Sequence, residues 1–119
     1  DVCVPISALP ECIDRILAVV AETAIPAPLV GHVGDGNFHL VLLFDPSDPK
    51  ETEAARRINA RLIAIALELG GTSTGEHGVG LGKKAYMADE HGPALGLMRQ
   101  IRQAIDPRGI MNPSKIFDV

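Results

Sequence analysis

Aromatic residues are scarce in this sequence, which has three Phe, one Tyr and no Trp among its 119 residues. Basic residues are not in excess either, since the formal net charge is -4. Proteins that bind nucleic acids need a basic surface and aromatic rings that stack on bases. We therefore expect no nucleic-acid partner.

Long apolar runs are also lacking. No stretch approaches the roughly 20 apolar residues that a membrane-spanning helix needs, and no basic and apolar leader opens the chain. The chain begins at Asp1 without an initiator Met, so we interpret it as a piece of a longer protein. We expect no transmembrane segment. The expected location is cytoplasmic, and the alternative is peripheral attachment of the full-length protein to a membrane.

Cysteine is rare. Cys3 and Cys12 are nine residues apart and form no C-x-x-C pair. This spacing, without a secretory signal, favours free thiols in a reducing compartment over a disulfide or a zinc knuckle.

The apolar pattern that is present indicates one α+β domain over residues 1–119, because this length supports one modest core. Strands are predicted at 1–6, 29–33, 37–44 and 72–74, and helices at 11–22 and 49–69. This β-α-β-β-α-β order is typical of a ferredoxin-like antiparallel sheet with its helices on one face. Two more helices, at 83–91 and 93–105, and an irregular tail, DPRGIMNPSKIF, follow.

Local signals support these elements. Ser7 is a candidate N-cap for the first helix, and Asp48, Pro49 and Glu51 together predict that the second begins near Pro49. The run FHLVLLF, residues 38–44, is apolar throughout, which predicts a strand buried on both faces.

The stretch GHVGDGNFH, residues 31–39, contains two histidines around an Asp-Gly turn. A two-residue turn at Asp35 and Gly36 would pair His32 with His39 across a hairpin. Directly opposed side chains have Cβ atoms about 4.5–5.5 Å apart, so both rings could reach one cation. The alternative is a hydrogen-bonded structural pair.

A second stretch, GGTSTGEHGVGLGKK at 70–84, places Glu76 and His77 side by side among glycines. Glu76 would complete a set of two histidines and one carboxylate with open coordination positions. His77 would then stay available as a base. The alternative is a flexible surface loop. In an ideal ferredoxin-like sheet, moreover, the hairpin turn and the end of the fourth strand lie at opposite ends, so either Glu76 meets the histidines over a face of the sheet or the predicted strand limits are wrong.

These two stretches and the DPRGIMNPSKIF tail, in this order, resemble the C-terminal domain of FAD-linked oxidases of the vanillyl-alcohol-oxidase type. The similarity is greatest to the branch of D-lactate dehydrogenase and the glycolate oxidase FAD subunit. The resemblance extends over nearly the whole chain. It implies a domain that closes over the flavin, with FAD bound mainly by a separate N-terminal domain of the same protein.

The resemblance also assigns residues. It implies a divalent metal, zinc, manganese or iron(II), held by His32, His39 and Glu76, and it makes His77 the catalytic base. Asn37 and Asn112 match positions expected near the flavin.

A mechanism follows from these assignments. A small D-2-hydroxy acid would chelate the cation, His77 would accept the hydroxyl proton, and hydride would pass from Cα to the flavin. Relatives that oxidise D-2-hydroxyglutarate tend to carry Asn two residues after the second histidine, where this chain has Val41. Val41 favours a small or apolar acid, so D-lactate is preferred, with glycolate oxidase and D-2-hydroxyglutarate dehydrogenase activities as alternatives.

An alternative of another class is a standalone, non-catalytic ferredoxin-like module for binding or oligomerisation. The mean hydropathy of +0.17 fits either class, since both expose apolar surface. The isolated chain is expected to be inactive in either case. The electron acceptor is not identified by the sequence, and a homo-oligomer remains an open expectation.

Overall fold

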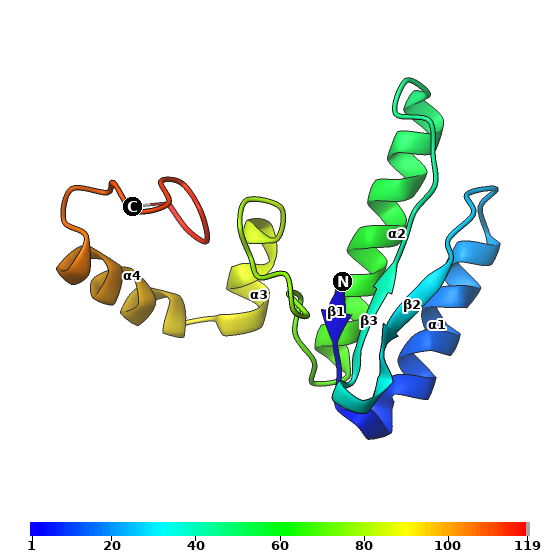
Figure 1. Cartoon of the computed structure of the whole chain (residues 1–119), viewed down its shortest axis with the longest axis horizontal. Helices are drawn as coiled ribbons and strands as arrows, with labels where there is room; N and C mark the ends of the chain where they lie inside the picture. The colour runs from blue at the N-terminus through cyan, green and yellow to red at the C-terminus, as the bar shows by residue number, and fades with distance from the viewer. Residues whose placement is uncertain (119) are drawn as a thin grey trace. The chain divides into compact units, whose positions relative to one another are not determined.

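The computed structural model describes residues 1–118, which group into two compact units (Figure 1). The first unit comprises Asp1–Glu76, and the second begins at His77. The α+β class predicted from the sequence is confirmed, with three strands and four α-helices among the described residues.

The first unit is an antiparallel sheet of three strands with two helices. Its strands are β1 (Val2–Cys3), β2 (Leu29–His32) and β3 (Asn37–Leu40), in the order β1-β3-β2. Its helices are α1 (Leu9–Ala21) and α2 (Pro49–Glu68), which lie side by side behind the sheet in Figure 1. Phe38 of β3 and Ile16 of α1 are fully buried in the core of this unit.

The predicted fourth strand is reduced to a single bridge between Thr72 and Cys3. The backbone N–H of Thr72 donates to Cys3 O at 2.8 Å, and the N–H of Cys3 donates back at 3.3 Å. Beyond this bridge the Thr72 hydroxyl accepts from the N–H of Thr74 at 3.4 Å. Such local bonds compete with a strand ladder, so a complete four-stranded sheet is not formed within the described residues.

Helix α2 begins as predicted. The Asp48 carboxylate accepts hydrogen bonds from the backbone N–H groups of Lys50, at 2.7 Å, and Glu51, at 3.4 Å. The buried positions of the helix are Ala55, Ile58, Leu62, Ile63, Ile65 and Ala66. The left-handed φ of +75° at Gly70 ends it, since glycine adopts this conformation without strain.

Helix α1 differs from the prediction at its start. It begins at Leu9 rather than Glu11, after a short 3-10 turn, η1 (Ile6–Ala8). Ser7 lies inside that turn and makes no capping hydrogen bond. The predicted Ser7 cap is therefore wrong, because the chain tightens into the 3-10 turn before the helix starts.

The hairpin is confirmed, but its predicted register is wrong. His32 pairs with Asn37, and His39 pairs with Val30. A 3-10 turn, η2 (Val33–Asp35), and Gly36 form a longer loop than the predicted two-residue turn. The cause is β1, because Val4 N–H donates to Gly36 O at 3.0 Å and so extends the β1-β3 pairing into the loop.

The prediction that residues 38–44 are buried on both faces is also wrong. Strand β3 ends at Leu40, and Val41 and Leu43 are 43% and 53% exposed. Phe38 faces the helices, whereas His39 lies on the opposite face, since successive strand residues alternate. Within the first unit that opposite face, called the open face below, is covered by no helix.

The second unit consists of three short helical segments and a tail. They are η3 (Lys84–Tyr86), α3 (Met87–His91) and α4 (Ala94–Ile105). Met87, Leu95 and Phe117 form its buried cluster. The predicted break between two helices at Gly92-Pro93 is confirmed.

The tail is irregular, as predicted, and conformationally strained. Asn112, Ser114 and Ile116 all have positive φ, of 46°, 64° and 72°. This is unfavourable for a β-branched residue such as Ile116. The N–H of Ile116 donates to Gly80 O at 2.9 Å, which helps to hold the segment in place.

Asp106 organises the turn that starts this tail and is only 7% exposed. Its carboxylate accepts from the N–H groups of Met111, at 2.8 Å, and Ile110, at 3.0 Å. Arg102 lies 3.3 Å from it. These hydrogen bonds, led by that from Met111, and the nearby guanidinium lower the pKa of Asp106.

No helix within residues 1–118 is long and apolar enough to cross a membrane.

We predict that Asp106 makes the stability of the second unit pH-dependent. Because its folded pKa lies below the unfolded value of about 3.9, its contribution is present above that pH and is lost as the pH falls through the folded pKa. Urea denaturation followed by circular dichroism should show a steeper loss of stability between about pH 5 and pH 2 for the wild type than for Asp106→Asn. Parallel pH profiles for the two proteins would contradict this prediction.

Candidate metal centre

The hairpin brings His32 and His39 to the same face of the sheet. With His32 opposite Asn37 and His39 opposite Val30, the two histidines are diagonal neighbours on the open face. Diagonal positions are farther apart than directly opposed ones, yet they remain within reach of ring side chains. The ring centroids are 6.2 Å apart and the planes are nearly perpendicular, at 86°.

Glu76 reaches both histidines over this open face. Its Oε1 lies 2.9 Å from His39 Nε2 and 3.7 Å from His32 Nε2. The fourth strand stops after one bridge, so the chain beyond Thr72 is free to turn over the sheet. Glu76 therefore meets the histidines over a face of the sheet, and the predicted fourth strand at 72–74 is reduced to one bridge.

These three side chains fit a divalent cation. Their ligand atoms all lie within 4.8 Å of one another. Two atoms bound to one ion at about 2.0–2.2 Å are themselves separated by about 3–4.4 Å. Two imidazole nitrogens and one carboxylate oxygen suit zinc, manganese or iron(II). The exposure of His32, 62% for its side chain, leaves room for further ligands on the solvent side.

The other predicted site residues have varied positions. His77 is exposed and is the first residue of the second unit, and its peptide bond keeps its Cα about 3.8 Å from that of Glu76. Asn37 is 5% exposed and lies on β3. Asn112 is exposed in the tail, with its Oδ1 3.5 Å from Lys115 Nζ. The roles of these three residues stay predictions.

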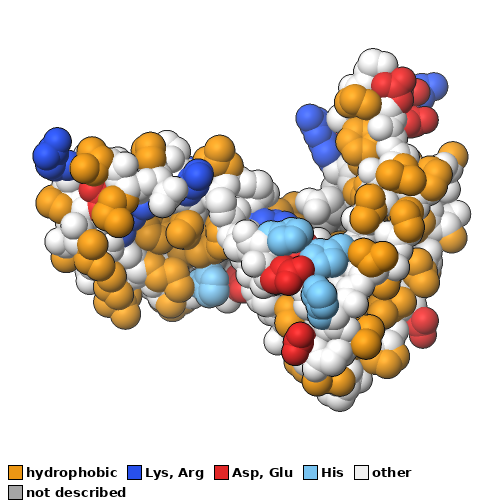
Figure 2. Space-filling model, viewed as in Figure 1, with side chains coloured by type: hydrophobic (Ala, Val, Ile, Leu, Met, Phe, Trp, Pro, Cys, Tyr) orange, Lys and Arg blue, Asp and Glu red, His pale blue; other side chains and the backbone are white. Residues whose placement is uncertain are grey.

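Hydrophobic side chains flank the candidate ligands. Val30, directly opposite His39, is 55% exposed, and Val41 and Leu43 continue from His39 along the same face. Figure 2 shows hydrophobic side chains beside the histidines and carboxylates of this face. A molecule bound at the centre would thus meet polar ligands on one side and an apolar surface on the other.

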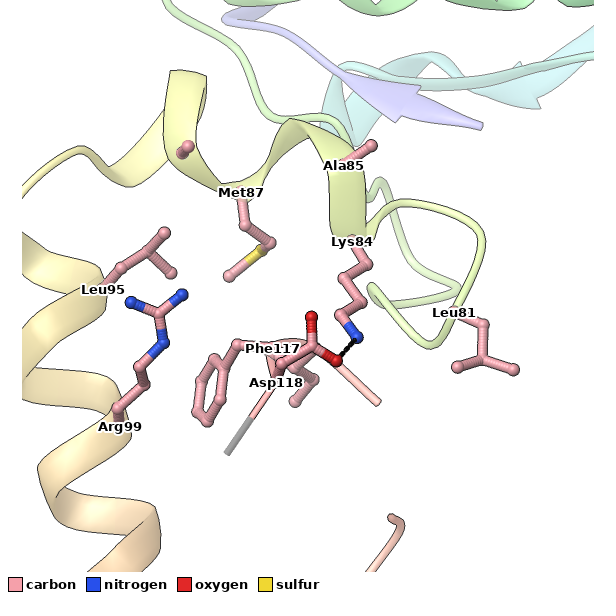
Figure 3. A pocket seen from close by; sticks show the side chains of 10 residues that line it. Leu81, Lys84, Ala85, Met87, Leu95, Arg99, Phe117 and Asp118 are labelled. Atoms are coloured by element: carbon pink, nitrogen blue, oxygen red, sulfur yellow. Dashed lines mark hydrogen bonds and ion pairs between the residues drawn. The ribbon is translucent and has the colours of Figure 1, made fainter. Parts of the chain in front are cut away.

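The second unit contains a pocket of about 420 Å³ (Figure 3). Its inner wall is apolar, from Met87, Leu95 and Phe117. Lys84 and Arg99 add positive charge, but Lys84 already pairs with Asp118, and the Arg99 guanidinium lies 5.9 Å from the Phe117 ring centroid. The cations therefore have partners from within the unit, and the pocket contains none of the predicted site residues.

Sequence reasoning missed Asp1, which lies 3.4 Å from His39 Nδ1 through its Oδ1. A sequence signal for this contact was available. A strand that begins at Val2 and pairs with the strand carrying His39 places the preceding residue, Asp1, beside that strand. Only the register identifies which histidine it approaches.

Residues 1–116 match the family described as FAD linked oxidases, C-terminal domain. The chain belongs to this family. The match includes residues of both compact units. The expected resemblance to this family is thus confirmed.

Curated relatives of this oxidase domain include dehydrogenases and an oxidase subunit. The chain is 45% identical to "Probable D-lactate dehydrogenase, mitochondrial" of Danio rerio, over 100% of this chain and 24% of that protein. It is 44% identical to "D-lactate dehydrogenase [cytochrome], mitochondrial" of Arabidopsis thaliana, over 98% and 21%. It is 36% identical to "Glycolate oxidase subunit GlcD" of Bacillus subtilis, over 98% and 25%. The chain thus spans about a quarter or less of the length of these relatives.

We predict that removal of either histidine abolishes stoichiometric metal binding. His32→Ala and His39→Ala each leave two ligands, which make a weak site. Titration of the chain with Zn²⁺ or Mn²⁺, followed by dialysis and elemental analysis, should find about one ion per wild-type chain and almost none in either variant. His91→Ala is the matched control, because His91 lies in the second unit beside Glu90. Wild-type metal content in both variants would rule out the centre.

Proposed function

We propose that this oxidase domain is the metal- and substrate-binding part of an FAD-dependent D-2-hydroxy acid dehydrogenase that converts D-lactate to pyruvate. The observation that carries the proposal is the convergence of His32, His39 and Glu76 on an open sheet face. The names of the D-lactate dehydrogenase relatives support the choice of reaction. The β-α-β-β-α order of the first unit, followed by the Cys3–Thr72 bridge in place of a fourth strand, also supports a ferredoxin-like arrangement.

The metal-binding role rests on the donor set. His32, His39 and Glu76 would hold the cation, and the exposed side chains of His32 and Glu76 leave positions for two oxygens of the substrate. When bound, the metal supplies Lewis acidity and a template for the carboxylate and hydroxyl of the acid. When bound, FAD supplies the hydride acceptor.

The base of the reaction is His77. A neutral imidazole accepts the hydroxyl proton while the C–H bond at Cα loses hydride, so the hydroxy acid becomes a 2-oxo acid with one proton left on His77. Its position next to Glu76 in the chain supports this role, because the peptide bond keeps the two Cα atoms about 3.8 Å apart.

Asn37 fits a position near the flavin-binding part of the protein. Its Oδ1 is buried and has no hydrogen-bond partner among residues 1–118. Buried acceptors are rarely left unsatisfied, so a donor from outside the described residues would complete it. Asn112 is the second proposed contact, from the exposed tail.

Glycolate oxidation is the second candidate, favoured by the similarity to "Glycolate oxidase subunit GlcD". D-2-hydroxyglutarate is less favoured, because Val41 offers its distal carboxylate no hydrogen bond. A non-catalytic module is not favoured either, since the matched family consists of oxidases.

The relatives' names bear on location. The Danio and Arabidopsis relatives are named as mitochondrial, so they do not support the expected cytoplasmic location. We propose a mitochondrial location if the full-length protein comes from a eukaryote.

We predict that His77→Ala in the full-length protein lowers kcat for D-lactate by about 10²–10⁴-fold, the usual contribution of a general base. Bound FAD and bound metal should stay at wild-type levels, because His77 is not among the three ligands. Reduction of an artificial electron acceptor measures the rate, and flavin absorbance measures the cofactor. His91→Ala serves as the matched control, and wild-type turnover by His77→Ala would refute the assignment of the base.

We also predict that Val41→Asn shifts the substrate preference of the full-length protein. An amide on the open face would offer a hydrogen bond to a distal carboxylate and would replace an apolar contact. The ratio of kcat/KM for D-lactate to that for D-2-hydroxyglutarate should fall by about tenfold or more, consistent with a change of 1–3 kcal/mol. An unchanged ratio would show that Val41 does not contact the substrate's side chain.

A further inference from the structure

The Asp1 carboxylate is buried next to the candidate metal centre. Its side chain is only 7% exposed, and its Oδ1 accepts a hydrogen bond from Asn37 Nδ2 at 2.8 Å. The same Oδ1 lies 3.4 Å from Nδ1 of His39. A buried carboxylate is unfavourable unless it is paired and hydrogen-bonded, so these neighbours account for its position.

The sheet register places Asp1 beside His39. Val2 pairs with Phe38 and Cys3 with Asn37 in the antiparallel β1-β3 pair. Extending this register by one residue sets Asp1 opposite His39. Directly opposed side chains share a face of the sheet and have Cβ atoms about 4.5–5.5 Å apart. The contact therefore follows from strand pairing rather than from a mobile loop.

Asn37 and Gly75 hold the carboxylate in place. Asn37 Nδ2 also donates to Val2 O at 3.1 Å, so the amide is tied to the β1 backbone. The backbone at Gly75 passes so close that an added Cβ would lie 2.0 Å from Asp1 Oδ1 and 2.6 Å from Asn37 Nδ2. Gly75 also has a φ of +52°. The loop that delivers Glu76 is thus pressed against the Asp1–Asn37 pair.

His39 has one carboxylate at each ring nitrogen. Asp1 lies on the Nδ1 side, and Glu76 lies 2.9 Å from Nε2. A neutral imidazole has one N–H and one lone pair. If the N–H is at Nδ1, it faces Asp1, and the Nε2 lone pair faces Glu76. Two electron-rich atoms, Nε2 and Glu76 Oε1, would then face each other, and a cation bound between them would make this tautomer favourable.

We propose that Asp1 is a positioning residue that accepts the Nδ1–H of His39 and thereby directs the His39 Nε2 lone pair to the metal. The proposal rests on the metal centre of the proposed function. Metal-binding histidines typically donate their second N–H to a carboxylate or carbonyl, which sets the tautomer and raises the basicity of the ligand. Asn37 extends this relay by fixing Asp1 in turn.

The test uses the full-length protein with Asp1→Ala and Asp1→Asn, after removal of metal by a chelator. Asp14→Asn is the matched control, because Asp14 is exposed on α1. Competition against a chelating dye gives the Kd for Zn²⁺ and Mn²⁺, while thermal unfolding and flavin absorbance report folding. Rates with D-lactate are measured over a range of Mn²⁺ concentrations.

For Asp1→Ala we expect the metal Kd to rise by about 10–100-fold, as for other partners of metal-bound histidines. Bound FAD should match the wild type, and kcat should recover at saturating Mn²⁺, since all three ligands remain. Asp1→Asn should fall between Asp1→Ala and the wild type, because its amide oxygen still accepts from Nδ1–H. If Asp1→Ala does not fold, the metal Kd of Asp1→Asn tests the proposal instead.

Three outcomes would overturn the proposal. An unchanged Kd in both Asp1 variants, with metal bound by the wild type, would refute the positioning role alone. A kcat that does not recover at saturating Mn²⁺ would show that Asp1 acts on the reaction itself and not through metal binding. A wild-type protein that binds no metal would refute the proposed centre together with this inference.

Discussion

The antiparallel pairing of β3 with both of its neighbours is the constraint on which the candidate site depends. β3 is the central strand, with β1 on one side and β2 on the other. His39 has Val30 on one side and, by extension of the register, Asp1 on the other. Segments distant in the sequence thus meet at one imidazole because backbone hydrogen bonds align them.

The same pairing explains why the face is both polar and apolar. Alternation along β3 sends Phe38 into the core and His39 outward, and the apolar run continues outward at Val41 and Leu43. In an isolated sheet such exposure would be unfavourable. Here Val41 and Leu43 leave an apolar surface next to the candidate ligands on the same face.

Much of the architecture could be predicted from local chemistry. Asp48 and Pro49 define the start of α2, Gly70 ends it, and Gly92-Pro93 separate α3 from α4, because caps and breakers act within one turn of the chain. The hairpin was also predictable, but its register was not. The longer loop arises because Val4 bonds to Gly36, and such a contact from another strand leaves no local sequence signal.

The sequence by itself determined which residues could form the centre: two histidines near a turn, and a Glu-His pair among glycines. Residue type and spacing suffice for that, since they decide what chemistry is available. Only the tertiary structure decided that Glu76 reaches both histidines and that Asp1 lies behind His39. These contacts depend on strand register and on the fourth strand ending after one bridge, and both are set by hydrogen bonds between segments far apart in the chain.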